Sequence, residues 1–254
     1  MRGDFVEIEG ARVVKLSPPG TPRKLVEDEV AFTRLAMESG LDVPFIHGVE
    51  ERDGRIGVVM DQVIGPNYLE WMLRTPLAWE KLSRFFAYEH HEMHMHRVPE
   101  LPSLKSRLGD SIGKAPAPKD LKFKALKALE LLPESETICQ GNFDPFNVIV
   151  SLDGLKVMDW SGASKGFYLG DVARTCLLLE LSSLRSVELG LSDEAANMLE
   201  KLRAGYRFEY LKICAKGEKE LKEWLLPVAM ARLGERIPGE GEHLKRIIQD
   251  CLER

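Results

Sequence analysis

The stretch "ICQGNFDPFNVIV", residues 138–150, contains the polar loop on which the fold and chemistry of this chain depend. It ends in the strand-like run "NVIV", which "SLDG" separates from a second strand-like run, "LKVM". Because Asp-Gly is a strong signal for a two-residue hairpin turn, the two runs are predicted to pair antiparallel. That pairing brings Asn147 and Asp159 side by side at the open end of the hairpin.

Asn147 and Asp159 present an amide oxygen and a carboxylate, which are hard oxygen ligands suited to Mg²⁺. The alternative is that Asn147 only begins a strand and Asp159 only ends one, with no ion between them. The hairpin alone favours this alternative, so the metal hypothesis depends on residues elsewhere in the chain.

Upstream, a strand and a helix carry a lysine and a glutamate. The alternating segment "ARVVKL" predicts a strand that includes Lys15. A helix is predicted over residues 23–39, and Glu29 falls within its apolar arc. An ionised carboxylate there is costly unless a cation meets it, and Lys15 is the nearest candidate in sequence. The alternative places Glu29 at the edge of the arc, where it reaches solvent.

The spacing between two asparagines matches a known catalytic loop. The protein-kinase loop places its base five residues before a metal-binding asparagine, in the order His-Arg-Asp and then Asn. Here Asn142 and Asn147 have that spacing, and Gln140 stands at the histidine position. Because an asparagine side chain cannot accept a proton from a hydroxyl at neutral pH, the spacing fits this loop while the proton chemistry does not.

Over nearly its whole length the sequence resembles the aminoglycoside phosphotransferase and choline-kinase-like family. The resemblance is carried by "EDEVAFTRLAMESGLDVPFIHGV", "GRIGVVMDQVIGP", "QGNFDPFNVIV", "VMDWSGASKGFYLGDVART" and "MARLGERIPGEGEHL". It implies an α+β, two-lobed protein-kinase-like fold. A small β-rich nucleotide-binding lobe is expected at residues 1–65, and a large helical lobe with the catalytic-loop hairpin at residues 66–254.

The resemblance also implies ATP or GTP and Mg²⁺ as cofactors, and a hydroxyl group of a small molecule as the phosphate acceptor. Lys15 is expected to contact the α- and β-phosphates, with Glu29 orienting it. The backbone that receives the adenine is expected at Met60, Asp61, Gln62 and Val63.

By the same resemblance, Asn147 and Asp159 hold the Mg²⁺, and Asn142 occupies the catalytic base position. Asp171 matches the residue that braces the catalytic loop, which is a structural role. The aromatic segment at residues 166–170, "GFYLG", is interpreted either as a wall near the acceptor or as part of the core.

The catalytic loop departs from the family at three positions. Gln140 replaces the usual histidine, Asn142 replaces the aspartate, and Asp144 replaces a residue that is often histidine. Asp144 is a candidate substitute for the base, acting directly or through water. The favoured alternative is that Asp144 makes a turn before Pro145.

The loop that covers the phosphates is reduced as well, since only Gly3 and Gly10 precede Lys15 and there is no G-x-G-x-x-G. These departures leave two functional hypotheses. The first is a small-molecule phosphotransferase weakened by the loss of the base. The second is a non-catalytic kinase-fold protein that binds a ligand or has a regulatory role.

Four of the six histidines occur in "EHHEMHMHRVPE", residues 89–100. His90 and His94 share a helical face at a spacing that can bind zinc. However, the segment lacks the HExxH order and no cysteine is nearby to complete a site. A solvated or packed helix end is therefore the favoured interpretation.

Composition and charge limit the partners and the cellular location expected for the chain. The chain has 254 residues and a net charge of −5, which indicates no general attraction to nucleic acid or to anionic membranes. No apolar run is long enough to span a bilayer, and the first ten residues lack the apolar core of a signal peptide. The four cysteines are far apart and are interpreted as reduced thiols. A cytoplasmic protein is expected, and its oligomeric state is left open.

Overall fold

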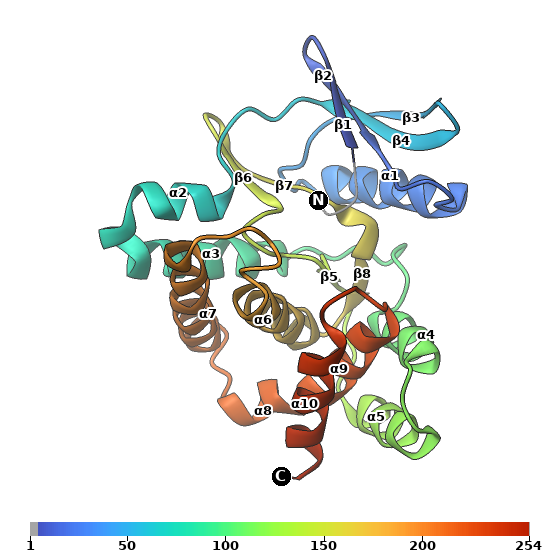
Figure 1. The fold of residues 1–254 in the computed structure, drawn as a ribbon, viewed down its shortest axis with the longest axis vertical. Helices are drawn as coiled ribbons and strands as arrows, with labels where there is room; N and C mark the ends of the chain where they lie inside the picture. The colour runs from blue at the N-terminus through green and yellow to red at the C-terminus, as the bar shows by residue number, and fades with distance from the viewer. Residues whose placement is uncertain (1–4, 254) are drawn as a thin grey trace. The chain divides into compact units, whose positions relative to one another are not determined.

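Four strands near the N-terminus form an antiparallel sheet in the order β1-β2-β4-β3 (Figure 1). The structure is a computed structural model and describes residues 5–253. Its elements in chain order are β1 (Phe5–Glu9), β2 (Arg12–Leu16), α1 (Arg23–Glu38), β3 (Ile46–Arg52), β4 (Arg55–Asp61), α2 (Tyr68–Arg74), η1 (Pro76–Ala78), α3 (Trp79–Met93), α4 (Leu104–Lys114), α5 (Lys119–Leu131), β5 (Thr137–Cys139), β6 (Val148–Ser151), β7 (Gly154–Val157), η2 (Trp160–Gly162), β8 (Ser164–Gly166), α6 (Tyr168–Leu184), α7 (Asp193–Ile213), α8 (Glu218–Glu223), α9 (Leu225–Gly234) and α10 (Gly241–Leu252).

The chain divides into two units. The N-terminal unit comprises the described residues up to Trp71 together with Gln140–Ala163, and the C-terminal unit comprises Met72–Cys139 and the residues from Ser164 onward. This division differs from the predicted one, because its first boundary lies within α2 and the β6–β7 hairpin belongs with the sheet. The physical reason is that Met158, which follows β7, packs into the core beneath the sheet.

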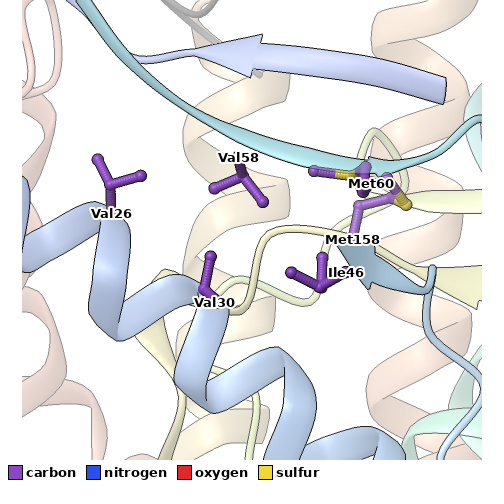
Figure 2. Close-up of a cluster of buried hydrophobic side chains, with 6 residues drawn as sticks. All are labelled: Val26, Val30, Ile46, Val58, Met60 and Met158. Carbon is purple, nitrogen blue, oxygen red and sulfur yellow. The ribbon is translucent and has the colours of Figure 1, made fainter. Parts of the chain in front are cut away.

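That core joins the sheet to α1. Figure 2 shows side chains from the helix, from two strands and from the segment after β7 pointing toward one another. Burying such apolar surface contributes about 25 cal/mol per Å² to folding. The β6–β7 segment is therefore held to the sheet by the same core that holds α1. The residues of this cluster are Val26, Val30, Ile46, Val58, Met60 and Met158.

Helix α1 begins after Pro22 and ends before Gly40, whose φ of 93° suits glycine best. Its boundaries agree with the predicted helix to within a residue. The apolar residue Leu25 of this helix is 56% exposed and does not belong to its buried face. The face that packs against the sheet consists of Val26, Glu29, Val30, Thr33 and Ala36.

Strand β1 is an edge strand that the sequence patterns did not predict. It pairs with β2 in the register Glu9↔Arg12, so Gly10 and Ala11 form a two-residue turn. The left-handed φ of 64° at Gly10 is typical of such turns. Gly3, the other glycine of this segment, lies outside the described residues. A tight hairpin therefore stands where a longer glycine-rich loop would cover the phosphates.

The C-terminal unit is mainly helical. Helices α3, α6 and α7 pack against one another, and α4, α5, α9 and α10 form a second packed group (Figure 1). A short antiparallel pair, β5 with β8, lies in this unit and was not predicted, because each strand has only three residues. No disulfide joins cysteines within residues 5–253.

No helix within residues 5–253 combines the length and the apolar character needed to span a membrane.

Candidate active site

An ion pair joins β2 to α1 in the N-terminal unit. Lys15 Nζ donates to Glu29 Oε1 at 2.5 Å, and the two side chains are only 6% and 9% exposed. The predicted contact is confirmed, and the alternative with Glu29 in solvent is wrong. Each charge would be costly if buried alone, so each depends on the other. Lys15 Nζ also lies 3.8 Å from Asp159 Oδ1, so one cation faces two carboxylates.

The β6–β7 hairpin pairs antiparallel, as predicted, and Val148 lies opposite Val157. Its turn is centred on Leu152 and Asp153 rather than on the Asp-Gly pair, because Ser151 pairs with Gly154 and its hydroxyl donates to the Gly154 carbonyl. At the open end, the Met158 amide donates to the Asn147 carbonyl at 2.8 Å. Asp159 follows directly, so both predicted metal ligands lie at this end of the hairpin.

Gln140 connects the predicted catalytic loop to the open end of the β6–β7 hairpin through hydrogen bonds. Its Nε2 donates to the carbonyl oxygens of Met158 at 3.0 Å and Asp159 at 2.7 Å. Its Oε1 accepts from the Asn142 amide at 2.7 Å. The fully buried Gln140 side chain thereby satisfies three backbone groups with a neutral amide. The sequence comparison identified Gln140 only as a departure from histidine, and this structural role was missed.

Asp159 sits at the centre of the candidate site in an uncommon backbone conformation. Its φ of 56° and ψ of 73° are left-handed, a region that aspartate tolerates better than most residues. Asn142 Nδ2 donates to Asp159 Oδ2 at 2.9 Å, and Ser161 Oγ donates to Oδ1 at 2.7 Å. Both carboxylate oxygens are therefore held by neutral donors. Ser161 was not predicted, and its only signal was its position two residues after Asp159.

The charge of Asp159 is set by these neighbours. Burial acts to raise the pKa of its carboxyl group, but the Lys15 ammonium and the hydrogen bonds from Ser161 and Asn142 outweigh burial and lower it below its ordinary value. Asp159 is therefore ionised at neutral pH. An ionised carboxylate is the form that binds a divalent cation.

Asn147 presents an unsatisfied oxygen. Its side chain is buried, and its Nδ2 donates to the Asn142 carbonyl at 3.1 Å. Among residues 5–253, Asn147 Oδ1 has no hydrogen-bond partner. A buried polar atom without a partner is costly and calls for a ligand, a water or an ion. Together with the Asp159 carboxylate, this oxygen gives a donor set that fits Mg²⁺.

Asp144 stabilises the turn between the two asparagines. Its Oδ1 accepts from the backbone amides of Phe146 at 2.8 Å and Asn147 at 3.2 Å. This is the turn that the sequence favoured, next to Pro145. Burial raises the pKa of the Asp144 carboxyl group above its ordinary value, although the two amides oppose that shift. One oxygen of Asp144 is thus already used to position the Asn147 backbone.

The segment expected to receive the adenine comprises the last two residues of β4, Met60 and Asp61, and the two residues after it. The Asp61 amide donates to the Phe45 carbonyl and the Gln62 amide to the Ala11 carbonyl, both at 2.9 Å. In the described part of the chain the Val63 amide has no hydrogen-bond partner. Val63 is therefore the position in this segment whose N–H is available to an acceptor on a ligand.

Asp171, expected to brace the catalytic loop, lies on α6 in the C-terminal unit. Its Oδ2 lies 3.2 Å from His90 Nε2 and 3.3 Å from His94 Nε2. The bracing role remains a prediction.

In the "GFYLG" segment, Phe167 stacks on Tyr168 with ring centroids 4.5 Å apart, and it also stacks on Trp224.

No protein-family model matches this chain, and no curated protein matches it in sequence. Solved structures do match. A thermostable mutant of aminoglycoside phosphotransferase APH(4)-Ia has a TM-score of 0.68 at 12% identity, over 98% of this chain and 90% of that one. Choline kinase LicA from Streptococcus pneumoniae has a TM-score of 0.60 at 14% identity, over 100% and 91%. Amicoumacin kinase hAmiN, in complex with AMP-PNP, Ca²⁺ and Ami, has a TM-score of 0.57 at 12% identity, over 98% and 87%.

The chain therefore has the protein-kinase-like fold, with a small antiparallel sheet and a helical C-terminal part. Solved structures that share this fold with it include an aminoglycoside phosphotransferase, an amicoumacin kinase and a choline kinase. The fold expected from the sequence resemblance is confirmed.

Proposed function

We propose that this chain is a phosphotransferase that moves the γ-phosphate of ATP or GTP to a hydroxyl group of a small molecule, with Mg²⁺ as cofactor. The observation that supports this most strongly is a single polar cluster in the N-terminal unit. It combines a buried cation, an ionised carboxylate and an amide oxygen without a partner. Its members are Lys15, Glu29, Asn142, Asn147 and Asp159.

The nucleotide would be held at two places in this unit. Lys15 would bind the α- and β-phosphates, and Glu29 would keep the ammonium in place through their 2.5 Å contact. The free amide of Val63, in the segment that begins at Met60, would donate to the base. The other proposed members of that segment, Asp61 and Gln62, support it through their bonds to neighbouring strands.

Asn147 Oδ1 and the Asp159 carboxylate would hold Mg²⁺. When bound, the ion supplies positive charge that neutralises the phosphate oxygens. The ligands need little reorganisation, because Gln140 fixes the backbone at Asp159 and Asp144 fixes the backbone at Asn147. Such prior positioning accounts for most of the catalysis in phosphoryl transfer.

Asn142 would orient the acceptor without removing its proton. Because Nδ2 is engaged by Asp159, the side-chain Oδ1 is the atom left to accept a hydrogen bond from a substrate hydroxyl. A positioned general base contributes roughly 10²–10⁴-fold to a rate. Little proton removal precedes the loose transition state of this reaction, so transfer is expected to be slow rather than absent.

A second candidate is a non-catalytic kinase-fold protein that binds a ligand. Two observations favour it. The base position carries an amide that bonds to Asp159, and the β1–β2 connection is only a two-residue turn. In this case the same cluster would bind nucleotide or another anion without transferring phosphate.

The site is tested by thermal shift with ATP and with GTP, each with and without Mg²⁺. Nucleotide with Mg²⁺ should raise the melting temperature more than nucleotide alone. Asp159→Ala should remove the metal-dependent increment, whereas the control Asp153→Ala, in the exposed β6–β7 turn, should retain it. An unchanged increment in Asp159→Ala would contradict the metal site.

Transfer is tested separately with γ-labelled nucleotide and a panel of hydroxyl compounds that includes aminoglycosides and choline. A labelled product, even a slow one, supports the enzyme. Nucleotide binding with neither transfer nor hydrolysis, in wild type and in Asn142→Asp, would favour the non-catalytic protein.

A further inference from the structure

Two histidines and an aspartate meet inside the C-terminal unit, apart from the residues assigned above to nucleotide binding. His90 and His94 lie one helical turn apart on α3. Their Nε2 atoms both face Asp171 Oδ2 on α6, at 3.2 and 3.3 Å. All three side chains are at least 97% buried. The sequence spacing suggested zinc but offered no cysteine as a further ligand, and the fold provides Asp171 instead.

The distances fit a metal site. Zinc binds histidine nitrogen and carboxylate oxygen at about 2.0–2.2 Å in a tetrahedral arrangement. Two ligand atoms of such a tetrahedron are therefore about 3.3–3.6 Å apart. The two Nε2–Oδ2 distances are close to this value, and the three candidate ligand atoms all lie within 4.8 Å of one another.

Each histidine is held by a tyrosine through its other ring nitrogen. His90 Nδ1 lies 2.7 Å from the Tyr206 hydroxyl, and His94 Nδ1 lies 2.6 Å from the Tyr210 hydroxyl. Metal-binding histidines generally donate their second N–H to an oxygen, which fixes the ring and the tautomer. Both tyrosines lie on α7, so three helices contribute to the arrangement.

We propose that His90, His94 and Asp171 bind one Zn²⁺ ion that links α3 to α6, with Tyr206 and Tyr210 orienting the two imidazoles. Because the ligands are buried, the ion enters as the unit folds and serves to stabilise it. This proposal is independent of phosphate transfer.

The experiment uses the full-length protein, unfolded in denaturant with a chelator, freed of metal and refolded with or without Zn²⁺. After exhaustive dialysis, wild type should retain about one zinc per chain, melt higher than the metal-free protein, and give a Co²⁺ absorption spectrum typical of tetrahedral coordination when refolded with cobalt. The His90→Asn/His94→Asn double variant should retain no zinc.

Two further variants separate metal binding from packing. His91→Asn, on the same helix but outside the cluster, should retain the zinc of wild type. Tyr210→Phe keeps all three ligands, removes only the support of His94, and should weaken zinc affinity by about 10–100-fold. If refolded wild type retains no more zinc than the double variant, or shows neither a cobalt spectrum nor a melting shift, the cluster is a hydrogen-bonded network and the proposal is wrong.

Discussion

At the scale of single residues, the exchange of one carboxylate for an amide changes what holds the candidate site together. Asn142 donates to Asp159 at 2.9 Å, so the loop and the predicted metal ligand attract each other without any ion. An aspartate at position 142 would face the Asp159 carboxylate at a similar distance, and like charges that close repel. The asparagine therefore helps to hold Asp159 in place without a bound metal ion.

Asn142→Asp is accordingly expected to lower stability in the absence of divalent metal by about 1–3 kcal/mol, because a charge-assisted hydrogen bond is replaced by repulsion. Mg²⁺ alone should restore most of the lost melting temperature in this variant while changing wild type little. Differential scanning calorimetry in chelator and in Mg²⁺ measures both effects.

Asn142→Ala is the control, since it loses the hydrogen bond but gains no charge. It should show a smaller cost and no recovery with Mg²⁺. If Asn142→Asp is as stable as wild type in chelator, the hydrogen bond to Asp159 does not hold the site. If the variant also increases phosphate transfer, by up to roughly 10²–10⁴-fold, the missing base is the reason for slow turnover.

At the scale of helices and strands, local patterns predicted the elements that have clear periodicity or turn residues. Helix α1, strand β2 and the β6–β7 hairpin are present as expected. Strand β1 was missed although Val6 and Ile8 alternate with glutamates, which is the pattern of a half-buried strand. The structure leaves these two apolar side chains 41% and 65% exposed, so their alternation does not mark a core face.

For the site residues too, local sequence patterns predicted only contacts between elements that are neighbours in the sequence. Lys15 and Glu29 were paired from a strand and a helix that are adjacent in sequence. By contrast, Tyr206 and Tyr210 meet His90 and His94 across 116 residues of sequence. No local period encodes such a contact, because it arises from how three helices pack. The supporting role of Gln140 was missed for a related reason, since its partners lie in the next hairpin.

The ion pair between β2 and α1 gives a prediction at this scale. Lys15→Met leaves Glu29 buried without its cation and should destabilise the chain by about 3–5 kcal/mol. The double variant Lys15→Met/Glu29→Leu should regain most of that loss, because a buried pair can be replaced by apolar side chains. Nucleotide binding should be lost in both variants. Urea unfolding and nucleotide titration measure the two effects separately.

Lys24→Met is the matched control. Lys24 pairs with Asp28 on the same helix, but its side chain is 77% exposed. Such a surface pair contributes about 0.3–0.5 kcal/mol. If Lys15→Met and Lys24→Met have the same free energy of unfolding, the buried Lys15–Glu29 pair does not stabilise the chain as predicted.

At the scale of the whole molecule, the N-terminal unit is discontinuous in sequence. Its core contains Val58 and Met60 from the sheet and Met158 from a segment that the chain reaches only after building much of the C-terminal unit. The sheet, α1 and the β6–β7 hairpin therefore form one folding unit from two stretches of chain. The predicted lobe of residues 1–65 lacks Met158, so it does not contain the whole of this core.

A fragment that ends at Trp71 is therefore expected to lack a cooperative thermal transition in circular dichroism. It retains the four strands and α1 but loses Met158 and β6, which pack against them. The full-length chain, measured in the same buffer, should melt cooperatively. A sharp transition in the fragment would show that the sheet and α1 suffice and that the hairpin is dispensable for this unit.

The two-residue turn between β1 and β2 has a consequence for the timing of the proposed reaction. With only Gly10 and Ala11 at that connection, little backbone is available there to close over a nucleotide's phosphates, so the complex should dissociate quickly. In the proposed reaction the chemical step would be slow, because Asn142 cannot take a proton. When chemistry is much slower than dissociation, KM equals the dissociation constant, and no burst of product precedes the steady state. The proposed enzyme would thus release and rebind its nucleotide many times for each phosphate that it transfers.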